Sequence, residues 1–255
     1  MTAQDTHTLP ESRSFPRDLV ILMYHHCADA PRDAVLPGLY VTPRQFAWQV
    51  DWLIGKGASF CTFEDLEQKR AGMSTGPLVM LTFDDGFRDV YENAWPILSA
   101  RRVSAVVYPV VGDIGKTGVV WPENTDRSPQ SLLTQDQIRE LAAGGIEFGS
   151  HLWDHRRASK METDELRRQL SRSKEELGRI LGHEPLSIAY PFGAYSDKVV
   201  EETRRAGYRY GVTTHEGSNK TAPMLELNRY AVRGTRLHHR WRFSRIMRQA
   251  LSAAA

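Results

Sequence analysis

Two pairs of residues in this sequence have side chains that could hold a metal ion and move a proton. Asp84 and Asp85 stand side by side directly after the apolar run at 78–83. His151 and His155 are four residues apart, so on one turn of a helix their imidazoles would face the same way and could share one cation. Two imidazoles and one carboxylate would leave positions open for water and substrate, as in a catalytic metal centre. The second carboxylate could then act as a base toward that water.

The composition directs attention to these residue types. The chain of 255 residues has 41% hydrophobic and 25% charged residues with a formal net charge of +2, which is typical of a globular protein and excludes intrinsic disorder. Its two cysteines, Cys27 and Cys61, are too few for a cysteine-based zinc site or a disulfide framework. Asp84 and Asp85 could also be ordinary solvated residues of a turn before Gly86. That interpretation is weaker, because an apolar strand leads directly into the Asp pair.

The elements predicted around these residues would place them at strand ends. Short β-branched runs alternate with helical patterns, which is typical of βα units around a parallel sheet. Capping boxes at Thr42 and Thr134 mark two helix starts, and a long charged helix is predicted from about 162 to Leu181 with its Glu and Arg side chains in solvent. Strands are predicted at 18–24, 78–84, 104–111, 147–151, 187–192, 209–214 and 227–232. Seven strands in this order predict an irregular barrel, whose chemistry collects at the carboxyl ends of the strands.

Three motifs in this order resemble those of the polysaccharide deacetylase family, also called the NodB-homology domain or carbohydrate esterase family 4. They are T-F-D-D-G at 82–86, H-x-x-x-H at 151–155 and A-Y-P-F-G at 189–193, and the match extends over 18–232. The opening L-M-Y-H-H at 22–26 resembles the branch that contains poly-N-acetylglucosamine deacetylases. The resemblance implies a deformed (β/α)7 barrel of the NodB-homology fold. It also implies a hydrolase that removes N-linked acetyl groups from amino sugars of a polysaccharide or glycoconjugate.

The resemblance carries a role to each motif residue. Asp84 corresponds to the general base, and Asp85, His151 and His155 correspond to the ligands of one divalent metal ion. That ion is zinc in most family members, and cobalt or nickel in some. The backbone N–H of Phe192 corresponds to a donor in the oxyanion hole.

The acid that protonates the leaving amine is expected to be a histidine. The branch that resembles the opening motif takes it from the first strand, which predicts His25, with His26 as its neighbour. A late L-x-H pattern that ends at His239 is the alternative. Ala189 stands where much of the family has an arginine that orients the catalytic Asp, so either another group orients Asp84 or the site is weaker than the family norm.

Aromatic residues after the strands are candidates for stacking on a sugar ring, namely Trp121 and Tyr195, and His215 could line the cleft. Two other functions remain open. A non-catalytic carbohydrate-binding relative would be expected to have lost at least one of the two Asp and two His. An O-acetyl esterase on the same scaffold would keep all four, because the same site hydrolyses esters more easily than amides.

The chain is expected to contain a polar tail at 1–17, a catalytic domain at 18–236 and a basic amphipathic helix at 237–255. Residues 228–255 hold seven Arg and no Asp or Glu, so the helix is predicted either to pack on the barrel or to make peripheral contact with an anionic membrane. The expected partner is an N-acetylated glycan or a lipid-linked sugar, and no nucleic acid. The chain as given has no signal peptide, which predicts a cytoplasmic location, at the inner membrane surface if the helix binds lipid. Nothing in the sequence indicates an oligomeric state.

Overall fold

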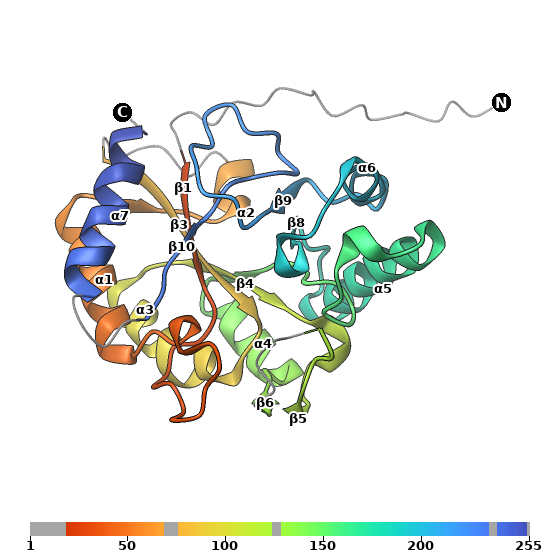
Figure 1. The fold of residues 1–255 in the computed structure, drawn as a ribbon, viewed down its shortest axis with the longest axis horizontal. Helices are drawn as coiled ribbons and strands as arrows, with labels where there is room; N and C mark the ends of the chain where they lie inside the picture. The colour runs from red at the N-terminus through yellow and green to blue at the C-terminus, as the bar shows by residue number, and fades with distance from the viewer. Residues whose placement is uncertain (1–18, 69–75, 124–128, 235–238, 254–255) are drawn as a thin grey trace.

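Seven parallel strands surrounded by helices form the centre of the molecule (Figure 1). The computed structural model describes residues 19–68, 76–123, 129–234 and 239–253. The seven strands are β1 (Leu19–Tyr24), β3 (Leu78–Asp85), β4 (Ala105–Pro109), β7 (Ile146–Phe148), β8 (Ser187–Ala189), β9 (Tyr210–Val212) and β10 (Tyr230–Ala231). Outside the seven are β2 (Ser59–Phe60), which pairs with β3, and the antiparallel pair β5 (Thr117–Val119) and β6 (Gln130–Ser131). The helices are α1 (Pro43–Gly55), α2 (Phe63–Glu67), α3 (Trp95–Arg101), α4 (Gln135–Ala143), α5 (Thr163–Leu181), α6 (Asp197–Arg205) and α7 (His239–Ala253).

The strands close into a ring that is irregular on one side. Five of them follow the order β10-β1-β3-β4-β7, with all pairs parallel. A single bridge from Ser150 to Ile188 continues the ring to β8, which pairs with β9. A second bridge, from Val212 to Leu227, leads to the segment that becomes β10. The predicted deformed (β/α)7 barrel is therefore confirmed, with β7 to β10 shorter than the sequence pattern suggested.

Strand β3 shows how the sequence directs side chains into two separate cores. All eight of its residues are buried, which is why the strand reads as a nearly continuous apolar run. Val79, Leu81 and Phe83 belong to the cluster shared with the surrounding helices, whereas Leu78 and Met80 belong to the cluster inside the barrel. Because side chains alternate along a strand, Thr82 and Asp84 continue the interior face. The strand therefore delivers the Asp84 carboxylate into the barrel.

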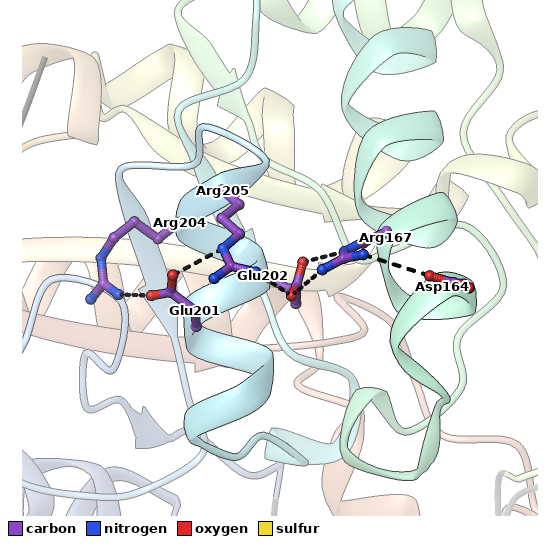
Figure 2. Close-up of polar contacts among 6 residues, drawn as sticks. All are labelled: Asp164, Arg167, Glu201, Glu202, Arg204 and Arg205. Carbon is purple, nitrogen blue, oxygen red and sulfur yellow. Dashed lines mark hydrogen bonds and ion pairs between the residues drawn. The ribbon is translucent and has the colours of Figure 1, made fainter. Parts of the chain in front are cut away.

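The helix starts read from the sequence are confirmed. Thr42 and Thr134 each form both hydrogen bonds of a capping box, at α1 and α4, and α4 ends at Gly144 as expected. Helix α5 packs beside α6, and Arg167 of α5 donates to both carboxylate oxygens of Glu202 on α6 at 2.7 and 3.0 Å (Figure 2). Arg205 also donates to Glu202, at 3.0 Å, so this carboxylate joins the two helices.

The C-terminal helix α7 lies against α1 (Figure 1). Its apolar side, with Phe243, Met247 and Ala250, is buried, and Trp48 and Trp52 of α1 meet the Phe243 ring edge-on at 6.1 and 5.7 Å. The apolar face that could have entered a membrane is thus occupied by the barrel. The N-terminal tail at 1–17, Asp18 and residues 237–238 and 254–255 of the expected segments lie outside the described residues. None of the helices in the described ranges has the length and apolar character needed to span a bilayer.

Candidate metal and catalytic site

Asp85 is turned toward the mouth of the barrel by two consecutive residues in the left-handed region. Asp85 has φ 71° and Gly86 has φ 74°, and the Gly86 amide donates back to the Asp84 carbonyl at 2.9 Å. A Cβ atom at Gly86 would lie 2.7 Å from the Cα atom of Pro109, so only glycine fits at this turn. The turn ends β3 and separates the directions of the two neighbouring carboxylates.

His151 and His155 lie in an irregular loop, so the predicted helical turn is wrong. Leu152 and His155 have φ values of 61° and 50°, which no right-handed helix contains. The loop is held instead by the chain after β4, where the amides of Val111 and Gly112 donate to the carbonyls of residues 152 and 153 at 3.0 and 2.9 Å. Non-glycine residues in this conformation cost free energy and persist where the surroundings enforce them, often at functional sites.

The loop brings both imidazoles onto one oxygen of Asp85. The Nε2 atoms of His151 and His155 lie 3.3 and 3.1 Å from Asp85 Oδ1, and the three side chains are almost entirely buried. His151 Nδ1 lies 2.7 Å from the carbonyl oxygen of Ala189. Because a carbonyl can only accept, Nδ1 carries the proton, and in the neutral ring the Nε2 lone pair faces the carboxylate.

A divalent cation fits this arrangement. The three ligand atoms lie within 4.8 Å of one another, and Asp85 Oδ1 has no hydrogen-bond partner although it is buried. Burial alone would raise the pKa of Asp85, but the neighbouring imidazoles of His155 and His151 outweigh burial and hold that pKa well below its ordinary value. A buried carboxylate that faces two imidazole nitrogens is therefore a ready set of zinc-type ligands.

Asp84 is held by Arg229, a residue that the sequence reasoning missed. The guanidinium donates to both carboxylate oxygens, from Nη1 to Oδ1 at 2.6 Å and from Nη2 to Oδ2 at 2.7 Å. Arg229 is fully buried and also donates to the Thr213 carbonyl at 2.8 Å and to Thr82 Oγ1 at 3.1 Å. Burial raises the pKa of Asp84, but the positive charge and hydrogen bonds of Arg229 lower that pKa by a larger amount, so the carboxyl group stays ionised.

Arg229 supplies the guanidinium that is absent at Ala189. We expected either a substitute group or a weaker site, and the structure provides the substitute. The signal in the sequence was alternation: Leu227, Arg229 and Ala231 share one face of the last strand, and Leu227 belongs to the core inside the barrel. Arg229 was overlooked because it was counted with the basic C-terminal segment.

The three candidate acids lie in different places. His25 follows β1, and burial lowers its pKa by more than the charges of Asp85 and Asp84 raise it. His26 is stacked between the rings of Tyr40 and Phe87, at 4.0 and 3.6 Å, with its Nδ1 atom 2.6 Å from Asp89 Oδ2, so it belongs to the barrel wall. His239 begins α7, where its ring meets Trp48 at 5.9 Å. Of the three candidates, His25 is thus the one whose pKa responds to both Asp84 and Asp85.

The aromatic candidates divide in the same way. Phe192 has φ 60°, and its ring lies 4.7 Å from that of His155. Trp121 is 3% exposed, contacts the His155 ring at 4.4 Å and donates to Asp113 at 2.7 Å, so it braces a candidate ligand and offers no open face to a sugar. Tyr195 is partly exposed, its ring stacks on that of Tyr190 at 5.4 Å, and its hydroxyl lies 3.4 Å from Nδ1 of the exposed His215.

Comparison with known proteins identifies relatives of one kind. The family model described as polysaccharide deacetylase matches residues 71–211, more than half of the chain. A Bacillus subtilis protein, YxkH, is 26% identical over 225 residues, which cover 85% of this chain and 72% of that protein. The poly-β-1,6-N-acetyl-D-glucosamine N-deacetylase of Staphylococcus aureus MRSA252 is 27% identical over 186 residues, 69% of this chain, and the match spans 61% of the relative's length. The solved structure of Streptococcus pyogenes deacetylase PplD in complex with acetate superposes with a TM-score of 0.74 at 25% identity, covering 92% of this chain and 98% of that one.

Proposed function

The chain belongs to the polysaccharide deacetylase family, and from this premise we propose that it is a metal-dependent hydrolase that removes N-linked acetyl groups from amino sugars of a polysaccharide. The observation that carries the proposal is the buried cluster of Asp85, His151 and His155 beside the Asp84–Arg229 pair. A relative that only binds carbohydrate would have no need to keep this set complete. The substrate class rests on the named activity of the staphylococcal relative and on the acetate bound to PplD.

Asp85, His151 and His155 would hold the divalent ion, which we propose to be zinc, with cobalt or nickel as alternatives. Such an ion supplies a Lewis acid that polarises the acetamide carbonyl and makes water more acidic. The hydrogen bond from His151 to the Ala189 carbonyl fixes which ring nitrogen faces the ion, as the outer partners of metal-binding histidines commonly do.

The remaining residues would carry the proton transfers. Ionised Asp84, oriented by Arg229, accepts a proton from the water that attacks the acetamide carbon. The backbone N–H of Phe192 donates a hydrogen bond to the oxygen that gains negative charge. His25 returns a proton to the amine as the carbon–nitrogen bond breaks, so that acetate and a free amino sugar leave. Tyr195 offers its ring to the sugar at the rim.

The decisive experiment joins metal analysis to acetate release. We expect the purified protein to bind one equivalent of a divalent metal and to release acetate from N-acetylglucosamine oligomers. Asp84→Asn should keep the metal and lose the activity, and His25→Ala should reduce the activity, whereas the exposed His183→Ala should change neither. A metal-loaded protein that releases no acetate from any amide substrate would overturn the proposal, and release from O-acetylated substrates alone would make the protein an esterase.

We also propose that α7 brings the barrel to an anionic membrane, where a lipid-linked sugar would be the substrate. Its outward side carries the exposed residues Arg242, Arg245 and Arg248, with no acidic residue in the helix, and Trp241 is 57% exposed. Exposed arginines beside a tryptophan suit the headgroup region of an anionic bilayer. The barrel at 18–236 and the helix at 237–255 would then act as a catalytic domain and its membrane contact.

A further inference from the structure

One side of α5 is directed at the loop that carries His151 and His155. The Glu and Arg side chains of this helix are exposed or partly exposed, as predicted, whereas Gln169 and Ser173 are buried. Glu165, Gln169, Arg172 and Ser173 follow helical spacing and form what we call the α5 polar stripe. Each of its four members contacts the segment 150–156.

Gln169 makes the central contact of the α5 polar stripe. Its side-chain oxygen accepts from the Trp153 amide at 3.1 Å, and its side-chain nitrogen donates to Asp154 Oδ2 at 2.8 Å. Trp153 and Asp154 lie between His151 and His155 along the chain. One buried amide, 8% exposed, therefore ties down both the backbone and a side chain in the middle of the loop.

The other stripe residues hold the two ends of the same segment. Ser150 donates to Ser173 at 2.9 Å next to His151, and Arg172 stacks on the Trp153 ring at 3.6 Å. Beyond Asp154, Arg156 donates to that carboxylate at 2.9 Å and also to Glu165. The loop is thus fixed to the helix on both sides of the contact that Gln169 makes.

We propose that Gln169 is a positioning residue for the metal site, which sets the separation of the two imidazoles and thereby the affinity for the ion. The inference rests on the proposed function insofar as that function places a metal on Asp85, His151 and His155. Two residues of the loop have positive φ values, Leu152 and His155, so the loop needs outside contacts to keep this shape. The Gln169 amide provides two such contacts in the middle of the loop. Residues that orient ligands from behind typically change metal affinity ten- to a hundredfold when removed.

The test compares two buried glutamines. Gln169→Met keeps the approximate length and volume of the side chain and removes both hydrogen bonds, and an open pocket of about 240 Å³ adjoins Gln169. Gln49→Met is the matched control, because Gln49 is 2% exposed and accepts from the Tyr24 hydroxyl at 3.1 Å, outside the segment 150–156. For each protein, the dissociation constant for Zn²⁺ is measured by chelator competition, the absorption spectrum is recorded with Co²⁺, and unfolding is followed in the metal-free state.

We expect both variants to be less stable without metal, and only Gln169→Met to bind Zn²⁺ about ten- to a hundredfold more weakly and to alter the Co²⁺ spectrum. A Zn²⁺ dissociation constant for Gln169→Met within about twofold of the wild type, or an equal change in Gln49→Met, would overturn the proposal. If the wild-type protein binds no divalent ion, the proposed function fails together with this inference. If it binds zinc and releases acetate while Gln169→Met binds zinc equally well, only this inference fails.

A second variant pair covers the case in which Gln169→Met does not fold. Gln169→Glu keeps the acceptor for the Trp153 amide but places a carboxylate against Asp154. Adding Asp154→Asn restores a donor opposite that carboxylate, with the polarity of the hydrogen bond reversed. We expect the single variant to weaken Zn²⁺ binding and the double variant to regain at least about fivefold of the loss. Absence of any recovery would argue against positioning through this contact.

Discussion

Replacing Arg229 by Met tests how strongly the barrel depends on the ion pair at its centre. The substitution keeps a long apolar side chain in place of the guanidinium. It leaves the Asp84 carboxylate, 4% exposed in the native pair, without its cation. The Thr213 carbonyl and Thr82 hydroxyl lose donors at 2.8 and 3.1 Å in the same step.

The expected loss follows from the burial of both partners. Removing one member of a buried, bidentate pair costs about 3–5 kcal/mol, because the other charge stays in a medium that solvates it poorly. A domain of this kind has a total stability of about 5–15 kcal/mol, so Arg229→Met should remain folded but with a clearly lower urea midpoint. Asp84→Asn added to Arg229→Met should cost less than the sum of the single changes, by about 2–3 kcal/mol.

The molecule contains a matched control on its surface. Arg101 pairs with Asp51 in the same bidentate way, at 2.6 and 2.9 Å, but the two side chains are 25% and 56% exposed. Arg101→Met should therefore cost at most about 1 kcal/mol. Unfolding in urea, followed by circular dichroism with chelator present, gives both numbers under the same conditions. Arg229→Lys, which keeps the charge and loses the fork, should retain bound metal and lower kcat about 100-fold.

Equal losses in Arg229→Met and Arg101→Met would refute this reasoning, because burial would then make no difference to the value of the pair. Full activity in Arg229→Lys would refute its second part, since orientation of Asp84 by two parallel hydrogen bonds would be unnecessary.

Three further predictions concern other parts of the molecule. Burial raises the pKa of Glu147 from 4.5 to about 8. At pH values between these two, the folded state holds a proton that the unfolded state has released. The free energy of unfolding should therefore fall as the pH rises from 5 to 8, by up to about 1.4 kcal/mol per pH unit more than in Glu147→Gln. The same pH dependence of the unfolding free energy in both proteins, measured in urea, would contradict this. Chelator should lower the Tm of the metal-loaded wild type and leave that of His155→Ala unchanged in calorimetry, because only the former gains stability from the ion. The protein should sediment with anionic and not with neutral vesicles, and Arg245→Glu with Trp241→Ala should abolish this; unchanged sedimentation would remove α7 as the membrane contact.

The parts of the fold that follow from local rules could be predicted from the sequence. The apolar run of β3 allowed only a strand buried on both faces, and Thr42 and Thr134 could cap helices only at the positions where α1 and α4 begin. The order of the motifs placed Asp84 and Asp85 at a strand end, and the turn at Gly86 needs the left-handed conformation that glycine adopts easily.

What could not be predicted depends on contacts between distant segments. The loop at 151–155 departs from helical geometry because the chain after β4 and helix α5 hold it, and neither contact is visible in a spacing of four residues. Arg229 lies 145 residues from its partner Asp84 along the chain, so a buried role could be inferred only by extending the alternation of the last strand. Gln169 has a spacing that suits either a solvated or a buried face, and only the position of the loop decides between them.

The pairing of Asp84 with Arg229 also has a consequence for the order in which a working site can arise during synthesis. The three motifs and all three candidate metal ligands have been synthesised once residue 193 is added, yet the cation that orients the proposed base is still to come. A nascent or truncated chain that stops before Arg229 would contain a complete ligand set next to an unneutralised, poorly directed carboxylate. The segment that pairs with β1 to close the ring also supplies the cation for the proposed base, so that activity would report the completed ring.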